Sequence, residues 1–538
     1  MLPVITIIRM RRIPPPLLLG YAPFVRNLII VFLFLTGCRS ASPDLILAGG
    51  RIFTADDARP WAEALAVRGE RIVAVGDDAS VRALAGPSTR VVELAGRLVV
   101  PGINDAHVHE PGSLESQSLD VAPNATVEAL FAAVAEGVQK HPDGTLLRAG
   151  IPIVHNDDPR LTRDRLDAIA PRHPVILGTL GGHSSLHNSL ALQYRGVGED
   201  AKDSQGGWYG RDAGGRLNGW VYEHAQWASD RALMQKRPDD VFAGELRSFA
   251  NDAMRYGITS VQTMAILDPA QVKRVAASFE LPLRIRWIDF RVESVDDAPR
   301  GPIKYILDGT PIERSAATRS DYADRPGHRG RMNYTDDDLR RIITAAAKTD
   351  APLLLHVVGD RALEQVFTLM RATPANWPAK RVRIEHGEMI GSFAEEAKEL
   401  GVILVQNPSH FMIGDVLRSR VQPGDLASYQ AFRSIAERGI PIAIGTDGPL
   451  NPWLNVMFAT MHPANPSEAL TREQAVIAYT RGSAFAEFAE KEKGTLAPGM
   501  LADLAVLSQD VFSVAPPELP KTQSVLTMIG GKIVWEQR

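Results

Sequence analysis

Six polar residues that can bind metal ions stand where apolar stretches of this 538-residue chain end. They are His107 and His109 in VVPGINDAHVH, Lys304 in GPIKYILDG, His356 in APLLLHVVGD, His386 in RVRIEHGE and Asp447 in IPIAIGTDGP. Short apolar runs bounded by Gly or Pro are typical of buried strands. Polar residues at the carboxyl ends of such strands would meet at the mouth of a parallel barrel. Because imidazoles with a carboxylate suit a divalent transition ion, zinc first, the pattern predicts a metal-dependent hydrolase.

Each of these residues also has an ordinary structural explanation. A lone His-x-His can arise by chance, although residues i and i+2 of a strand share a face and could bind one ion together. A histidine at a strand end is often only a polar residue, and the aspartate of GTDG could form a turn or cap a helix. A lysine inside IKYIL could extend its ammonium to the rim, but a buried ammonium needs a partner or a lowered pKa. The joint occurrence in this order favours the metal site.

The chain divides into four predicted parts. Residues 44–75 alternate apolar and polar side chains around Gly turns, and 503–535 do the same, which predicts a small β unit, residues 44–100 and 491–538, built from both ends. Between them, apolar strands alternate with helical stretches such as 336–348 and 392–400, so residues 101–490 are predicted to form βα units. Residues 114–253 do not follow this alternation, and we expect an insertion near the barrel mouth that shapes the substrate site.

The first 38 residues read as a targeting segment. The run LIIVFLFLTG, residues 28–37, is too short to span a bilayer but suits a signal-peptide core, with Arg26 as its positive flank. Leu35 to Cys38, LTGC, resembles the lipobox of bacterial lipoproteins, which implies a lipid-anchored protein of the cell envelope facing the periplasm or the exterior. A plain secretory signal with an incidental cysteine is the alternative, and the long basic leader suggests a true start nearer Val25. Arg39 and Ser40 follow the cysteine without the Asp that favours inner-membrane retention in Gram-negative lipoproteins, so the resemblance slightly favours an outer-membrane destination in a host that has one.

The overall charge argues against one class of partner. Lys plus Arg number 59 and Asp plus Glu 63, a net charge of −4, so nothing indicates nucleic acid as a partner. The sequence leaves a homo-oligomer open.

Several separated motifs resemble the amidohydrolase superfamily, and within it amidohydrolase family 3, the branch that includes the N-substituted formamide deformylases. The motifs run from about residue 44 to the C-terminus, and in chain order they are PGINDAHVH (101–109), GGHSSLHNSLAL (181–192), IKYILDG (303–309), LHVVGDRAL (355–363), RIEHGE (383–388), QNPSH (406–410), GTDGP (445–449) and KGTLAPGMLADLAVL (493–507). Two departures, the DGPL sequence and Asn407 near the expected site, leave the substrate's identity open.

The resemblance implies an α/β fold, a (β/α)8 TIM-like barrel with a small β-sandwich formed by both termini. It implies His107, His109 and Asp447 on one zinc ion, His356 and His386 on a second, and a carboxylated Lys304 bridging them. Such a bridge would turn a costly buried cation into an anionic ligand and hold two ions about 3.5–4 Å apart. Asp447 would accept the proton of the attacking water and return it to the leaving nitrogen. His183 would hydrogen-bond the developing oxyanion, unless it is a structural loop histidine.

We therefore expect a metal-dependent hydrolase that cleaves a C–N bond, most simply an amide other than a peptide bond, in a small molecule by a metal-activated hydroxide. The same scaffold could instead act on a cyclic imide, ester or lactone, or catalyse an isomerisation. From another class, the chain could be a metal-loaded binding lipoprotein without catalysis. Retention of Asp447, the proposed proton shuttle, argues against that alternative.

Overall fold

The computed structural model describes residues 42–111, 114–292 and 294–537. The expected signal peptide, residues 1–38 with Cys38, lies outside the described residues. Within the described ranges, no helix combines the length and the apolar character needed to cross a membrane.

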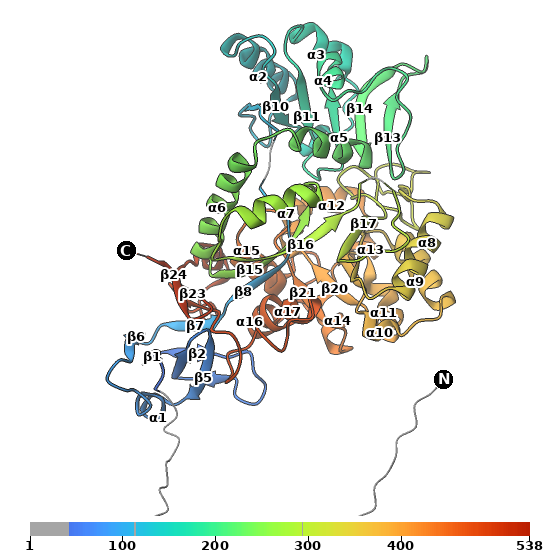
Figure 1. The fold of residues 1–538 in the computed structure, drawn as a ribbon. Helices are drawn as coiled ribbons and strands as arrows, with labels where there is room; N and C mark the ends of the chain where they lie inside the picture. Colours follow the sequence, from blue (N-terminus) through green and yellow to red (C-terminus); the bar gives the residue numbers. More distant parts are fainter. Residues whose placement is uncertain (1–41, 112–113, 293, 538) are drawn as a thin grey trace, which may run out of the picture. The chain divides into compact units, whose positions relative to one another are not determined.

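Eight parallel strands form the central sheet, and their order along the sheet is their order along the chain (Figure 1). They are β8 (Ile103–Val108), β15 (Ile258–Ala265), β16 (Arg284–Phe290), β17 (Ile303–Ile306), β18 (Leu353–Val357), β19 (Arg383–His386), β20 (Ile403–Gln406) and β21 (Ile442–Ile444). Every neighbouring pair is parallel. The first and last strands meet through their ends, where the Asp447 N–H donates to the His107 carbonyl at 3.0 Å. The predicted TIM-like barrel is confirmed.

Helices connect these strands and cover the barrel. They include α6 (Asp239–Arg255), α7 (Pro269–Ser278), α8 (Asp336–Lys348), α9 (Asp360–Ala372), α10 (Trp377–Lys380), α11 (Ala394–Leu400), α12 (Gly414–Arg420), α13 (Pro423–Ala427), α14 (Phe432–Glu437), α15 (Pro452–Met461), α16 (Arg472–Ile477) and α17 (Ser483–Ala486). The predicted helix 336–348 is confirmed, and Thr335 and Asp338 begin it with a capping box. The predicted helix 392–400 starts two residues late, because a 3₁₀ turn occupies Ile390–Phe393.

Strands from both ends of the described chain share one sheet (Figure 1). Its order is β24 (Lys532–Glu536), β23 (Ser524–Ile529), β22 (Leu504–Leu507), β7 (Leu98–Pro101), β2 (Arg51–Phe53) and β3 (Trp61–Ala62). A second, four-stranded sheet has the order β5 (Arg71–Gly76), β4 (Ala64–Arg68), β1 (Leu45–Ala48) and β6 (Arg90–Glu93). The two sheets bury a common apolar core that includes Leu47, Ile52, Val67, Val506 and Met528. Burial of this shared surface is what holds the two chain ends together.

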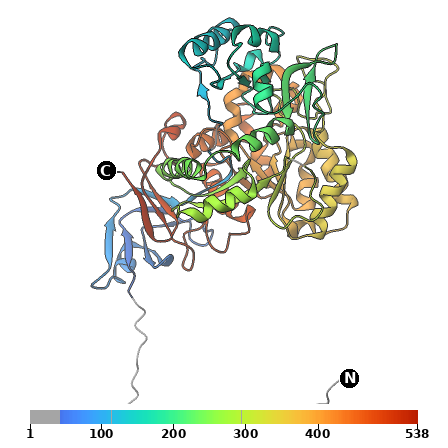
Figure 2. The same cartoon turned by 45° about the horizontal axis from the view of Figure 1, so that its top comes forward.

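A third sheet lies between the first and second barrel strands in the sequence, and Figure 2 shows its helices from another side. Its order is β13 (Gly207–Arg211), β14 (Leu217–Glu223), β12 (Ser184–His187), β11 (Val175–Gly178), β10 (Leu147–Gly150) and β9 (Gln117–Ser118). The helices of this segment are α2 (Val127–Lys140), α3 (Arg163–Ile169), α4 (Ser189–Tyr194) and α5 (His224–Met234). The sheet is mixed, parallel from β9 to β11 and antiparallel from there on, so it does not extend the barrel's βα alternation.

Candidate active site

A cavity of about 560 Å³ opens at the carboxyl ends of the barrel strands. All seven residues that the sequence singled out line it: His107, His109, His183, Lys304, His356, His386 and Asp447. Its other walls are mainly apolar, from Trp227, Met234, Phe290, Ile306 and Met412 among others. A concave, mostly apolar site with a few convergent polar groups is typical of small-molecule sites.

His107 and His109 reach the cavity from the end of β8, where strand alternation puts them on one face. A Cβ added at Gly445 would lie 2.4 Å from the Cβ of His107, so only glycine allows the last strand to approach the first this closely. His109 donates its Nδ1–H to the Met264 carbonyl at 3.2 Å. Since a carbonyl can only accept, Nδ1 is the donor in this bond, and Nε2 of His109 points toward Asp447, 3.3 Å from its carboxylate.

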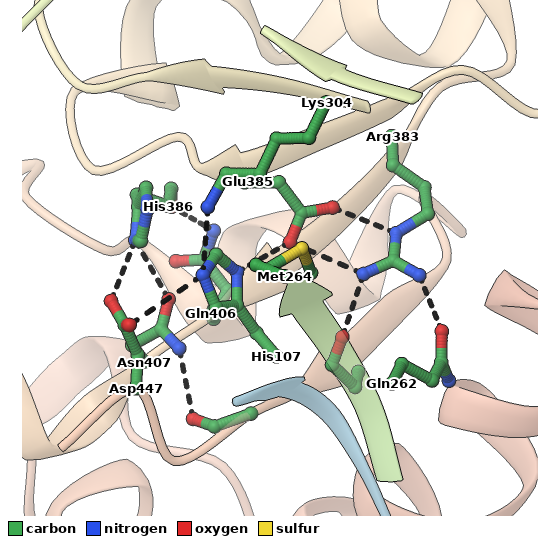
Figure 3. Close-up of polar contacts among 12 residues, drawn as sticks. His107, Gln262, Met264, Lys304, Arg383, Glu385, His386, Gln406, Asn407 and Asp447 are labelled. Atoms are coloured by element: carbon green, nitrogen blue, oxygen red, sulfur yellow. Dashed lines mark hydrogen bonds and ion pairs between the residues drawn. The ribbon is translucent and has the colours of Figure 1, made fainter. Parts of the chain in front are cut away.

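The ring of His107 is held from behind by an acid (Figure 3). Its Nδ1 lies 2.6 Å from Oε2 of Glu385, and both side chains are fully buried. Arg383 donates to both oxygens of Glu385, at 2.7 and 3.2 Å. Burial alone would raise the pKa of Glu385, but Arg383 and His107 lower it to about 2, so the carboxylate is charged. The proton of His107 therefore sits on Nδ1, and Nε2 presents its lone pair to the cavity.

Lys304 ends in the same place, from β17. Its Nζ lies 3.0 Å from Nε2 of His107 and 5.7 Å from the centre of the Phe290 ring. Burial lowers the pKa of Lys304 to about 8, because a buried ammonium is costly. The amine is thereby closer to its neutral, nucleophilic form than an exposed lysine would be.

His356 and His386 come from the ends of β18 and β19, and their ring centres are 4.4 Å apart. Burial lowers the pKa of both well below the usual value, so both rings are neutral. His386 donates Nδ1–H to Oδ1 of Asn407 at 2.9 Å, and Asn407 in turn donates to the Gly445 carbonyl, which fixes the orientation of its amide (Figure 3). The backbone of His386 has a positive φ of 70°, a strained conformation of the kind found at functional sites.

Asp447 lies between these rings, also on a strained backbone with φ of 41°. Its carboxylate oxygens are 3.5 Å from Nε2 of His107, 3.3 Å from Nε2 of His109 and 3.7 Å from Nδ1 of His386. Burial alone would raise the pKa of Asp447, but the surrounding imidazoles hold it well below its usual range. Asp447 is thus an anionic carboxylate placed among several imidazoles.

His410 belongs to the same cluster, although it was not predicted from the sequence as a site residue. Its Nε2 lies 3.4 Å from Asp447 and its Nδ1 lies 2.5 Å from Glu388, which also accepts a hydrogen bond from the Tyr429 hydroxyl. Burial alone would lower the pKa of His410, but its bonds to Asp447 and Glu388 raise it to about 10. The QNPSH block pointed to this loop, but no feature of the sequence distinguishes His410 from an ordinary loop histidine.

His183 approaches from the inserted sheet, just before β12. Its ring centre is 5.0 Å from that of His356, and its Nδ1 lies 2.8 Å from Oε2 of Glu223. Burial opposes the charged form of His183, but the Glu223 carboxylate outweighs burial and the pKa of His183 is raised. Glu223 is almost fully buried and has a positive φ of 52°, so its backbone is strained to hold this pair. Glu223 was not predicted from the sequence.

The donor set fits a divalent cation. Two clusters have ligand atoms within 4.8 Å of one another, His107 with His109 and Asp447, and His386 with His410 and Asp447. His107, His109 and His386 all donate through Nδ1 to a protein oxygen, the arrangement typical of histidines that bind a metal through Nε2. Within the part of the chain that the structure describes, Nε2 of His356 is buried without a hydrogen-bond partner. A cation at this position would satisfy that atom.

The chain is similar to known proteins over most of its length. The chain is 27% identical to the N-substituted formamide deformylase of Arthrobacter pascens, over 92% of this chain and 98% of that protein. It is 26% identical to protein LONG AFTER FAR-RED 3 of Arabidopsis thaliana, over 91% of each chain. The fold resembles the crystal structure of an uncharacterized metal-dependent hydrolase from Pyrococcus horikoshii, with a TM-score of 0.66, 20% identity, and coverage of 88% of this chain and 99% of that one. The sequence profile of the amidohydrolase family matches residues 90–535, and the chain therefore belongs to the amidohydrolase family.

Proposed function

We propose that this protein hydrolyses an amide-type C–N bond of a small molecule at a site for two divalent ions, zinc first. The observation that carries the proposal is the shared orientation of His107 and His109, whose Nδ1 atoms are held by protein oxygens and whose Nε2 atoms lie 3.5 and 3.3 Å from the Asp447 carboxylate. We assign His107, His109 and Asp447 to one ion and His356 and His386 to the other. When bound, the ions would activate water and polarise the substrate carbonyl.

Lys304 is the proposed bridge between the two halves of the site. Its buried amine can attack carbon dioxide and lose a proton, which forms an anionic carbamate at Nζ. The carbamate removes the cost of a buried cation beside His107, and its two oxygens can serve two ions.

Two further side chains would carry the proton and the developing charge. Asp447 is anionic and close to three imidazoles, so it can accept a proton from water and return it to the leaving nitrogen. His183 can donate a hydrogen bond from Nε2 toward the substrate oxygen, because Glu223 holds its Nδ1 and favours its charged form. The apolar walls would exclude bulk water from the reacting groups.

Elemental analysis and a hydrolysis screen test the proposal together. Gently purified protein should contain about two divalent ions per chain. It should hydrolyse some member of an amide series that includes N-substituted formamides, the compounds in the name of the Arthrobacter relative. Asp447→Asn should lower kcat far more than it weakens substrate binding, since the amide cannot accept a proton. Full activity in metal-free, chelator-treated protein would contradict the proposal.

We also propose, from the sequence of the N-terminal segment alone, that Cys38 is lipidated and anchors the protein to an envelope membrane. Two or more acyl chains would be needed for a stable anchor, since each buried CH₂ contributes only about 0.8 kcal/mol. Cell fractionation tests this directly: the wild type should partition with membranes, and Cys38→Ser should remain unprocessed or be released. Wild-type protein found wholly in the cytosol with residues 1–37 attached would contradict the anchor and leave the enzyme proposal untouched.

A further inference from the structure

One charged side chain of the cavity has no part in the proposed chemistry. Arg148 lies in β10 of the inserted sheet, partly buried, and its side chain lines the same cavity as the histidine cluster. No hydrogen bond or ion pair from residues 42–111, 114–292 or 294–537 reaches its guanidinium. An arginine remains charged at any physiological pH, so this wall of the cavity carries an uncompensated positive charge.

The acid that attracts Arg148, Asp230, is already engaged by another arginine. Asp230 of α5 accepts a hydrogen bond from Arg195 at 2.6 Å, and the Arg195 side chain is only 2% exposed. Arg195 also donates to the Ser229 hydroxyl and to the Gln226 carbonyl, so it is fixed in place. Asp230 is therefore paired with Arg195 and only attracts Arg148 without forming an ion pair with it, and the Arg148 side chain faces the cavity without a counter-ion in contact.

Helix α5 forms part of the cavity wall that Arg148 and the histidine cluster share. Its residues Trp227, Asp230 and Met234 lie at helical spacing and all line the cavity. The Trp227 ring is 5.1 Å from His183 and 5.1 Å from Phe290, at the metal-binding end. Asp230, the acid beside Arg148, lies one helical turn further along, about 4.5 Å of rise. The uncompensated charge and the histidine cluster thus border one cavity, joined by an apolar and aromatic wall.

We propose that Arg148 is a specificity-determining residue that binds a carboxylate of the substrate, so that the preferred substrates are amides carrying one carboxylate and an apolar portion between the two groups. This inference rests on the proposed function. A guanidinium pairs with a carboxylate through two parallel hydrogen bonds. A monoanion fits better than a dianion such as a phosphate monoester, because the Asp230 carboxylate lies close by and would repel the second charge.

Matched substrates test the proposal on the metal-loaded enzyme. One series consists of N-acyl amino acids and the second of half-amides of dicarboxylic acids, which place the carboxylate on the amine side and on the acyl side of the scissile bond. Each acid is compared with its neutral primary amide. The wild type should favour one acid series by about tenfold or more in kcat/KM, as expected for a charged hydrogen-bonded pair. Arg148→Met should raise KM for that acid about tenfold, leave kcat nearly unchanged and leave the neutral amide unaffected.

Two variants separate recognition from folding. Arg148→Lys keeps the charge without the planar fork and should retain part of the preference. Arg172→Met removes an exposed arginine of the same inserted segment that pairs with Asp143, and it should change nothing. Equal use of acid and amide by the wild type, or an equal loss for both in Arg148→Met, would overturn the proposal.

Calorimetric binding to metal-free protein distinguishes this inference from the proposed function. If the acid binds in an Arg148-dependent manner but no amide is hydrolysed, the carboxylate site stands and the cleavage proposal fails. If neutral amides are hydrolysed and the acids neither bind nor react better, the cleavage proposal stands and the carboxylate site fails.

Discussion

Nδ1 of His107 lies 2.6 Å from Oε2 of Glu385, and neither side chain has any exposed surface. A carboxylate behind an imidazole fixes the ring's tautomer and raises its basicity toward a metal ion. Arg383 keeps Glu385 charged, and Arg383 is itself held in place by hydrogen bonds to Gln262 and to the Ala106 carbonyl (Figure 3). The pair joins β8, which bears the proposed ligand His107, to β19, which bears the proposed ligand His386.

Replacing this acid should weaken metal binding without removing a ligand. Glu385→Gln loses the charge that orients and polarises His107, and we expect metal affinity to fall about 10- to 100-fold. Titration of metal-depleted protein with zinc in a competing chelator measures the change. Glu490→Gln, which alters an acid paired with Arg381 outside the cavity, is the control and should bind zinc as the wild type does. Unchanged zinc affinity in Glu385→Gln would show that His107 is not a ligand.

Removing the proposed bridge should have a larger effect. Lys304→Met keeps an apolar stem in the buried position but cannot form a carbamate, so metal content should drop and the rate should fall by orders of magnitude. A short carboxylic acid supplied with bicarbonate should restore part of the activity by replacing the missing anion. Lys380→Met, at a lysine that pairs with Asp350 away from the cavity, is the matched control. Normal metal content and a near-normal rate in Lys304→Met would mean that Lys304 is not a bridge.

His356 and His410 compete for the role of ligand beside His386. His410 uses both ring nitrogens as donors to Asp447 and Glu388, and these acids keep it protonated, whereas Nε2 of His356 is buried without a partner in the described part of the chain. A protonated imidazole cannot bind a metal. His356→Asn should therefore lose about one ion per chain, and His410→Asn should keep both, as measured by elemental analysis. The reverse result would assign the second ion to His410.

The strand pattern was enough to place the barrel and to gather most of the site. His107, His109, Lys304 and His356 follow the alternation of their strands, so their positions could be inferred from spacing alone. His386 could not, since Arg383 and Glu385 occupy the inward face of the same strand and simple alternation would turn the next residue away. The positive φ at His386 and Gly387 redirects the side chain into the cavity.

The residues that the sequence did not reveal depend on contacts between distant segments. Glu223 meets His183 across 40 residues, and Glu385 meets His107 across 278. Neither acid stands out locally, because an isolated glutamate in a strand has no sequence feature that names its partner. Arg148 is similar, since its uncompensated charge is visible only once Asp230 is seen bound to Arg195.

Glu223 should control how His183 presents its proton. Glu223→Gln keeps a hydrogen bond to Nδ1 but removes the charge that raises the pKa of His183, so kcat should fall, by about 10- to 100-fold, with a smaller change in KM. Steady-state kinetics on the best amide substrate measures both constants. Glu199→Gln, at an acid of the same inserted segment that pairs with Arg163, is the control. A rise in KM alone would indicate that His183 only contacts the bound substrate.

Asp308, in the IKYILDG motif, ties the loop after β17 to the loop after β18. Its Oδ2 accepts the N–H groups of Ala317 and Gly359 at 2.9 and 2.8 Å, and its Oδ1 accepts the N–H of Val358 at 2.9 Å. Asp308→Asn places an amide NH₂ against one of these donors. The variant should therefore be less stable by about 1–3 kcal/mol, the usual cost of an unsatisfied buried group.

The pH dependence of this loss distinguishes Asp308 from a generic core position. Burial raises the pKa of Asp308 from its usual value to about 7. A carboxyl whose pKa is raised in the folded state contributes its full stability below its unfolded pKa, and that contribution is lost as the pH rises through the folded pKa. Between about pH 5 and pH 8 the wild type should lose more unfolding free energy than Asp308→Asn does, so the two should converge as the pH rises. Urea denaturation at several pH values measures this, with Asp415→Asn, at a side chain that is 97% exposed, as the control. A gap between wild type and Asp308→Asn that widens with pH would show that the fold favours the charged carboxylate at this position.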